Sequence, residues 1–208
     1  MIATKAETEE EEFFASFNVP PEARRKLKIH RDLLLKWQKA VNLVSRETLK
    51  DVFRRHFADS LQLIPHLSGK KILDVGSGGG FPGLVLAAFG DFSVTCIDSD
   101  RKKMLFLEET ARAAEIKVTL VTGRIEELQT YDFDIVCARG FAELSTLLAV
   151  VDKFSVAKRG VFLKGAKLNA EIEKACRFFD FQYETYPSVT DNRGKIIGVN
   201  SVRRRAQP

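Results

Sequence analysis

The chain has 208 residues, of which 45% are hydrophobic, and its formal net charge is +5. No stretch approaches the roughly 18 apolar residues that a membrane-spanning helix needs. The first twelve residues lack the basic start and the apolar run of a secretory signal. We therefore expect a cytoplasmic protein that does not associate with membranes. We also expect a monomer.

The charge is unevenly distributed. The first twelve residues hold one Lys and five Glu, a sum of −4, so the remainder of the chain carries +9. A basic body with an acidic leader suits a polyanionic partner such as RNA, although ordinary surface charge explains the same numbers equally well. The same two interpretations apply to the basic residues Arg24, Arg25, Lys26, Lys28 and Arg31.

The three cysteines are Cys96, Cys137 and Cys176. Their odd number and wide spacing fit neither a zinc site nor a disulfide framework, and the three histidines add no metal-ligand spacing. We therefore expect no metal. Cys96 and Cys137 lie in apolar runs, which predicts buried thiols in a reducing compartment.

The first 66 residues are expected to be helical. The leader, residues 7–17, is acidic and then aromatic, which predicts a short helix that docks its phenylalanines, Phe13, Phe14 and Phe17. A second helix starts at residue 22, after a Pro-Pro pair, and a third is predicted over 49–63. The apolar residues of the second helix recur at heptad-like spacing: Leu27, Leu34, Trp37 and Val41.

From residue 67 onward, strands alternate with helices. Strands are predicted at 71–75, 93–97, 117–121, 133–138, 160–164, 181–186 and 195–202, and helices at 82–89, 102–114, 144–151 and 169–178. This alternation predicts an open α/β sheet of seven mostly parallel strands, in which a closing hairpin adds one antiparallel strand. We divide the chain into an N-terminal helical extension, 1–66, packed on a Rossmann-like core, 67–208.

Ligands of such sheets bind beyond the carboxyl ends of the strands. The first of these ends is a glycine-rich loop that contains Gly76, Gly78, Gly80 and Gly83. Glycines let the backbone turn tightly and approach a ligand, and the helix that Pro82 opens directs its first N–H groups at the same place.

Two cofactors fit this loop. Residues 78–83 satisfy G-x-G-x-x-G, and Asp98 follows Gly78 by twenty residues, which is the dinucleotide pattern. However, the strand contains Asp74, which would repel a pyrophosphate and suits the ammonium and sulfonium of S-adenosylmethionine. Residues 73–78 also resemble the first motif of Rossmann-like methyltransferases. We therefore predict S-adenosylmethionine against Gly76 and Gly78, with an NAD-dependent oxidoreductase as the alternative.

The next two strand ends supply further candidates. Asp98 can accept both ribose hydroxyls of the cofactor, while Asp100 is either its reserve or the N-cap of a helix. After the third strand, Ile125 is expected beside the adenine and Glu126 can accept from its exocyclic amine. Glu127 is better explained as a surface carboxylate at a helix start.

Two cations follow the fourth and fifth strands. Arg139 comes after four apolar residues, at the mouth of the predicted site. It can bind an RNA phosphate, a guanine edge or the methionine carboxylate. Lys164 occupies the corresponding position at the end of the fifth strand.

Several stretches together resemble one family. They are 37–45, 55–60, 74–83, 97–99, 124–127, 138–141 and 163–165. The sequence resembles the bacterial small-subunit ribosomal RNA guanine-N7 methyltransferases, also called the glucose-inhibited division protein B family. The resemblance implies a class I methyltransferase fold. It also implies methyl transfer from S-adenosylmethionine to N7 of a guanosine in 16S ribosomal RNA, free or in a small-subunit particle, with S-adenosylhomocysteine as product.

The resemblance also implies which residues contact the cofactor and the RNA. It implies cofactor contacts at Gly76, Phe81, Ile125, Glu126 and Arg139. Arg55, His56, Arg124 and Lys164 are candidate RNA contacts. The chain departs from the family in residues 196–200, which are less apolar than expected, and in the added arginines of 203–205.

N7 of guanine carries a lone pair and no proton, so the reaction needs no general base. We expect catalysis by positioning, with Arg139 and Lys164 orienting the substrate rather than transferring protons. The competing interpretations are a methyltransferase for another RNA or a small molecule, and an RNA-binding relative without catalytic activity.

Overall fold

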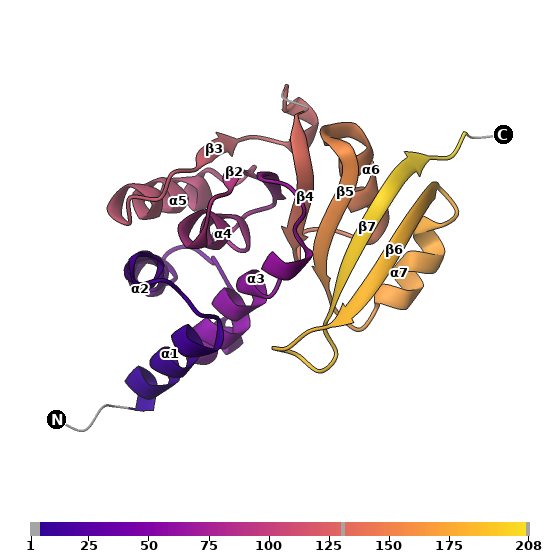
Figure 1. Cartoon of the computed structure of the whole chain (residues 1–208). Helices are drawn as coiled ribbons and strands as arrows, with labels where there is room; N and C mark the ends of the chain where they lie inside the picture. The colour runs from indigo at the N-terminus through magenta and orange to yellow at the C-terminus, as the bar shows by residue number, and fades with distance from the viewer. Residues whose placement is uncertain (1–4, 130–131, 207–208) are drawn as a thin grey trace.

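The computed structural model describes residues 5–129 and 132–206, and its centre is one seven-stranded sheet (Figure 1). The strand order is β3-β2-β1-β4-β5-β7-β6. The strands are β1 Lys71–Val75, β2 Ser93–Asp98, β3 Thr119–Thr122, β4 Phe133–Arg139, β5 Ser155–Lys164, β6 Phe179–Pro187 and β7 Lys195–Arg204. β7 runs antiparallel to both β5 and β6, whereas β1 to β5 pair in parallel. The predicted sheet, with its single antiparallel strand, is confirmed.

Helices cover both faces of the sheet. The α-helices are α1 Lys5–Ser16, α2 Pro21–Trp37, α3 Asp59–Leu61, α4 Gly83–Phe89, α5 Arg101–Ala113, α6 Leu144–Phe154 and α7 Leu168–Ala175. The 3-10 turns are η1 Arg46–Asp51, η3 Ile64–His66 and η4 Ile125–Glu127, and η2, Phe53–Ala58, is a π-helix. In Figure 1, α6 and α7 lie on one side of the sheet, and α2, α4 and α5 lie on the other.

Two hydrophobic clusters fill the space between these layers. Side chains alternate across a strand, so Ile72 of β1 faces the cluster beneath α2, α4 and α5, whereas Leu73 faces the cluster beneath α6 and α7. The first cluster also contains Phe14 of α1 and Leu27 of α2. The N-terminal helices and the sheet therefore share one core across residue 66, and the division at that residue stays a prediction.

The acidic leader packs on the basic helix that follows it. Phe13 and Phe14 of α1 are buried and Phe17 is half-buried, which confirms the predicted docking. Glu10 is buried and pairs with Lys28, at 2.7 Å, and with Arg31. Other pairs on this face are Arg24 with Glu11, and Arg25 and Lys26 with Glu22. The basic residues of α2 thus have acidic partners in the chain itself, which favours a paired surface over an RNA contact.

The region between α2 and β1 differs from the prediction. α2 ends at Trp37, and the Gln38 side chain holds the turn that follows, because its Oε1 accepts from the N–H groups of Leu43 and Val44, both at 3.0 Å. The helix predicted over 49–63 is built from η1, η2 and α3 in succession. Apolar spacing indicates a helical segment but does not distinguish α from π geometry.

Candidate cofactor pocket and the arginine network beside it

A pocket of about 440 Å³ opens at the carboxyl ends of β1, β2 and β3. Five of the residues predicted for the site line it: Gly76, Asp98, Arg124, Ile125 and Glu126. Ser99, Lys103, Gly140 and Phe141 line it as well. The pocket therefore gathers residues that follow four different strands, as expected for an open α/β sheet.

Two glycines of the loop are required by close packing. A Cβ added at Gly76, where φ is 71°, would lie 2.2 Å from Cδ2 of Phe141. A Cβ added at Gly83 would lie 2.5 Å from Oδ2 of Asp74 and 2.6 Å from Sγ of Cys96. The first glycine lets the backbone reach the pocket surface, and the second lets α4 pack directly on β1 and β2.

Asp98 joins the loop to the pocket. Its Oδ2 accepts from the N–H of Gly78 at 2.9 Å, and its Oδ1 accepts from the N–H of Asp100 at 2.9 Å. Each carboxylate oxygen keeps a second lone pair for a hydroxyl donor. Asp100 instead caps α5, because its Oδ1 accepts from the N–H groups of Lys102 and Lys103 at 2.9 and 3.3 Å. The N-cap interpretation of Asp100 is thereby confirmed.

Asp74 lies under the loop rather than in the pocket. It is fully buried, and its Oδ2 accepts from the N–H of Gly83 at 3.0 Å, while its Oδ1 has no partner among the described residues. Burial raises the pKa of Asp74 to about 6. This carboxyl anchors the start of α4, and any effect on a cationic ligand comes from its charge and not from a contact in this structure.

The turn after β3 has an apolar side and a polar side. Ile125 is buried and lines the pocket, next to the exposed carboxylate of Glu126. Glu127 accepts from the N–H of Arg124 at 3.3 Å and so closes the turn, which agrees with its interpretation as a structural residue. Arg124 is exposed at the rim.

Phe81 is buried behind the loop. Its ring stacks on His30 with 4.9 Å between centroids, and the guanidinium carbon of Arg139 lies 5.0 Å from its centroid. The ring does not line the pocket, so the contact that the resemblance implies at Phe81 would have to come from its backbone.

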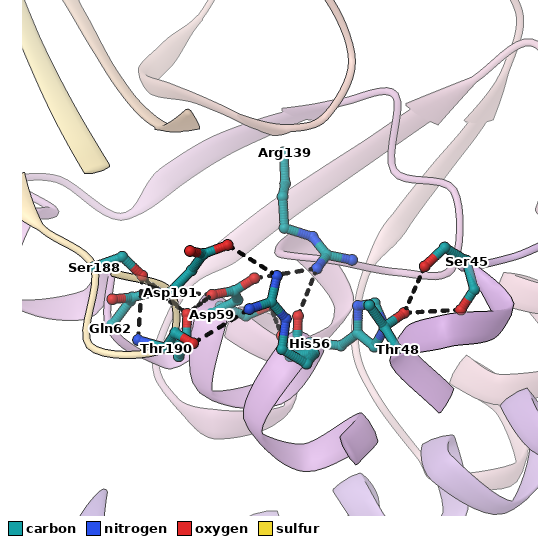
Figure 2. A network of polar contacts seen from close by, with 11 residues as sticks. Ser45, Thr48, His56, Asp59, Gln62, Arg139, Ser188, Thr190 and Asp191 are labelled. Carbon is teal, nitrogen blue, oxygen red and sulfur yellow. Dashed lines mark hydrogen bonds and ion pairs between the residues drawn. The ribbon is translucent and has the colours of Figure 1, made fainter. Parts of the chain in front are cut away.

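Arg139 belongs to a polar network next to the pocket (Figure 2). Its Nη1 donates to the carbonyl of Arg55 at 2.9 Å and lies 3.4 Å from Oδ2 of Asp59. Burial lowers the pKa of Arg139, and the charge of Asp59 opposes that shift. Burial also raises the pKa of Asp59, against the effect of the Thr190 hydroxyl and the two arginines. The pair is therefore held together in a largely dehydrated environment.

The network reaches the loop between β6 and β7. Arg55 donates to the carbonyl of Thr190 at 3.3 Å and to Oδ2 of Asp191 at 3.1 Å. Oδ1 of Asp59 accepts from the Thr190 hydroxyl and, at 3.0 Å, from Nε2 of Gln62. Figure 2 shows Asp59, Gln62, Thr190 and Asp191 grouped below Arg139. The guanidinium of Arg55, a predicted RNA contact, is thus bound by groups of the protein itself.

Two further predicted residues have internal partners. His56 is 4% exposed, and its Nε2 lies 2.8 Å from the Thr48 hydroxyl. Burial and then the charges of Arg139 and Arg55 lower its pKa to about 3, so the ring is neutral near pH 7. Lys164 donates to the carbonyl of Ala142 at 2.8 Å and pairs with Glu171 at 2.5 Å. An RNA contact by either side chain would require these interactions to open.

A larger cleft, of about 1350 Å³, lies between the N-terminal helices and the β6–β7 loop. It does not include the glycine loop or the end of β2. Its charges balance, with Arg31, Lys50 and Arg54 against Glu12, Asp32 and Asp51. It therefore lacks both the glycine loop and the excess positive charge that a nucleic-acid groove would show.

Comparison with known proteins identifies the family. The family model GidB, described as rRNA small subunit methyltransferase G, matches residues 23–197. The chain belongs to the rRNA small subunit methyltransferase G family. Two relatives named ribosomal RNA small subunit methyltransferase G come from Paramagnetospirillum magneticum and Rhodospirillum rubrum. They are 37% and 39% identical to the chain, over 95% and 93% of it and 98% of each relative.

The fold agrees with this assignment. The crystal structure of magnesium protoporphyrin IX methyltransferase from Synechocystis PCC 6803 with bound S-adenosylmethionine superposes with a TM-score of 0.59. It is 17% identical in sequence, and the match covers 85% of this chain and 97% of the other. The predicted membership of the methyltransferase G family and its class I fold are therefore confirmed.

Ser99, Lys103, Gly140 and Phe141 line the pocket in this member of the methyltransferase G family without having been predicted as site residues. Ser99 and Phe141 both fall in stretches that match the family, directly after the ends of β2 and β4, and that position was the available signal. Lys103 lies in the first turn of α5 and has no such signal.

Within residues 5–129 and 132–206, no group of three or more His, Cys, Asp or Glu side chains could hold a metal ion. Over the same residues, every helix is too short or too polar to cross a bilayer. Cys96 and Cys137 are buried, and burial raises the pKa of both thiols.

Proposed function

We propose that this protein transfers a methyl group from S-adenosylmethionine to N7 of a guanosine in 16S ribosomal RNA. The observation that carries the proposal is the pocket at the ends of β1 to β3, which combines the glycine loop with the carboxylate of Asp98. It occurs in a chain of the rRNA small subunit methyltransferase G family.

The pocket residues complement the cofactor group by group. We assign the backbone of Gly76 to its methionine end and Asp98 to its ribose hydroxyls. Gly78, predicted as a cofactor contact, does not line the pocket and instead donates its N–H to Asp98. Ile125 offers an apolar surface to the adenine, and Glu126 an acceptor to the exocyclic amine. The volume of about 440 Å³ lies within the usual range of small-molecule pockets.

When bound, S-adenosylmethionine supplies an electrophilic methyl group. The protein then has to place the guanine lone pair in line with it, since N7 has no proton to remove. Holding two reactants at attack distance can lower a barrier by roughly 7–11 kcal/mol. We assign this orienting role to Arg139, whose guanidinium is fixed by Asp59 and by the Arg55 carbonyl. A guanidinium held there suits guanine O6 or a phosphate.

Lys164 supports the same region indirectly. By binding the carbonyl of Ala142 it holds the segment that follows Phe141. The carboxylate of Glu171 forms an ion pair with Lys164, at 2.5 Å, and accepts a hydrogen bond from the N–H of Leu144, at 2.8 Å. We therefore propose that Lys164 shapes the end of β4, and that of the four predicted RNA contacts Arg124, which is exposed at the pocket rim, is the best placed to meet RNA.

The test uses methyl-labelled S-adenosylmethionine with unmodified small-subunit RNA, both naked and assembled into particles. We expect label at N7 of a single guanosine, and the ratio of the two yields shows which form is the substrate. Asp98→Asn serves as the inactive control at low cofactor concentration. Measurable cofactor binding without label in either RNA would overturn the ribosomal assignment and leave the cofactor site intact.

A further inference from the structure

We propose that His30, in the N-terminal helix α2, is a positioning residue for the cofactor loop. Its imidazole N–H donates to the carbonyl of Gly79 and so holds the peptides between Gly78 and Phe81 in the shape that receives the cofactor. This inference rests on the proposed function of the pocket. It gives part of the N-terminal helical region a role in cofactor affinity.

The contact is specific in geometry and in protonation. His30 is 0% exposed, and its Nε2 lies 2.8 Å from the oxygen of Gly79, which is 49 residues away in the chain. A carbonyl can only accept, so Nε2 must carry the proton. Burial lowers the pKa of His30 to about 4, which keeps the ring neutral near pH 7, and its Nδ1 has no partner among the described atoms.

The ring is fixed from two sides. It stacks on Phe81 with an interplanar angle of 17°, and it meets the ring of Phe57 edge-on, 5.2 Å away. A Cβ added at Gly80 would lie 3.1 Å from Cε1 of His30. The imidazole therefore contacts the loop at Gly79 and Phe81 and leaves no room for a side chain at Gly80, so it has little freedom to turn away.

The neighbouring peptides are held by other groups. The carbonyl of Ser77 accepts from the N–H groups of Gly80, at 2.7 Å, and Phe81, at 3.2 Å. The N–H of Gly78 donates to Asp98, the residue that we assign to the ribose. The peptide between Gly79 and Gly80 is thus held by Ser77 at its N–H but not at its carbonyl, and the flanking glycines allow that carbonyl a wide range of orientations. His30 is the partner that the structure provides for this carbonyl, so loss of the donor leaves the peptide held on its N–H side alone.

The experiment compares two variants of the full chain. His30→Gln and His30→Met lose the ring alike, but only glutamine keeps an N–H donor. We expect His30→Met to bind S-adenosylhomocysteine about 3- to 10-fold more weakly than His30→Gln, the range for one hydrogen bond. Titration calorimetry measures the affinities. In the methylation assay we expect a higher KM for S-adenosylmethionine in His30→Met and the same kcat at saturation.

Leu27→Ala is the matched control, because Leu27 is fully buried one turn earlier on the same helix and makes no polar contact with the loop. We expect it to lower the melting temperature and leave the affinity unchanged. Equal affinities for His30→Gln and His30→Met would overturn the inference, as would a loss in Leu27→Ala as large as that in His30→Met. Absence of S-adenosylhomocysteine binding by the unmodified chain would overturn the proposed cofactor site itself, and His30's role with it.

Discussion

The carboxyl edge of the sheet has two halves with different electrostatic organisation. At the ends of β1 to β3, Asp98 and Glu126 face an open pocket. At the ends of β4 and β5, Arg139 and Lys164 are bound to protein carbonyls and carboxylates. The ends of β1 to β3, the open half, keep hydrogen-bonding capacity for a ligand. The ends of β4 and β5, the restrained half, hold their cations at fixed positions.

This difference separates two functions, cofactor binding and substrate orientation. A pocket with free acceptors sets the affinity for a small cofactor, because each new hydrogen bond adds to binding. A cation restrained by a network needs little reorganisation during the reaction, so it favours orientation and rate. Substitutions in the two halves should therefore change different kinetic constants.

The largest effect is expected from Arg139→Ala. Removing the guanidinium takes away the orienting cation and leaves the half-buried Asp59 without its ion-pair partner. We expect the single-turnover rate of methylation to fall about 100-fold, the scale of a misplaced substrate, with S-adenosylhomocysteine affinity changed far less. Arg177→Ala, at an exposed arginine outside the site, is the control. Full activity of Arg139→Ala would show that the restrained half does not serve the reaction.

Asp98→Asn should give the opposite pattern. The variant loses a charged acceptor for the ribose hydroxyls, so we expect S-adenosylhomocysteine to bind about 10- to 100-fold more weakly, with near-normal turnover once S-adenosylmethionine saturates. Asp100→Asn is a close control, because asparagine caps a helix as well as aspartate does. If both variants lose affinity equally, the ribose assignment is wrong.

The pH dependence of stability tests the buried groups behind the loop. His30 and His56 have folded pKa values of about 4 and about 3, below the unfolded value of 6.5. Each therefore stabilises the fold above pH 6.5 and loses that contribution as the pH falls through its folded pKa. Asp74, with its pKa raised to about 6, acts in the opposite sense: its contribution is full below pH 3.8 and is lost as the pH rises through 6.

We therefore expect the free energy of unfolding to fall between pH 6.5 and 4. The loss should be about 1–3 kcal/mol smaller in His30→Gln than in the unmodified chain, and larger in Asp74→Asn. Urea unfolding at several pH values provides the measurement. Identical pH profiles for the three proteins would mean that these groups titrate normally.

Glu126→Gln should have the smallest effect. The carboxylate is exposed, so its hydrogen bond to the adenine amine competes with water. We expect a loss of about 2- to 5-fold in S-adenosylhomocysteine affinity and an unchanged kcat. A loss as large as that in Asp98→Asn would indicate that Glu126 does more than accept from the amine.

Local patterns predicted the open half of the edge well. Strand periodicity and the glycine loop placed Gly76, Asp98, Ile125 and Glu126 at strand ends, and the structure brings them into one pocket. Parallel strands put their carboxyl ends on one edge, so residues far apart in the chain could be placed together without a contact map.

The restrained half could not be predicted in the same way. Asp59 meets Thr190, which is 131 residues later, and Arg139 meets the Arg55 carbonyl, 84 residues earlier. Such partners depend on how the β6–β7 loop packs against η2 and α3, and on the π geometry of η2, which apolar spacing does not encode. The burial of His56 and Phe81 was missed for the same reason.

The position of β7 has a consequence for synthesis of the chain. β7 lies between β5 and β6, so it must be added to the sheet after both of its neighbours have been translated. Until Arg204 has left the ribosome, β5 presents an unpaired edge with Val161 and Phe162 in it, and such edges recruit strands of other chains. Nascent chains that stall before residue 195 therefore leave the β5 edge open to pairing with other chains.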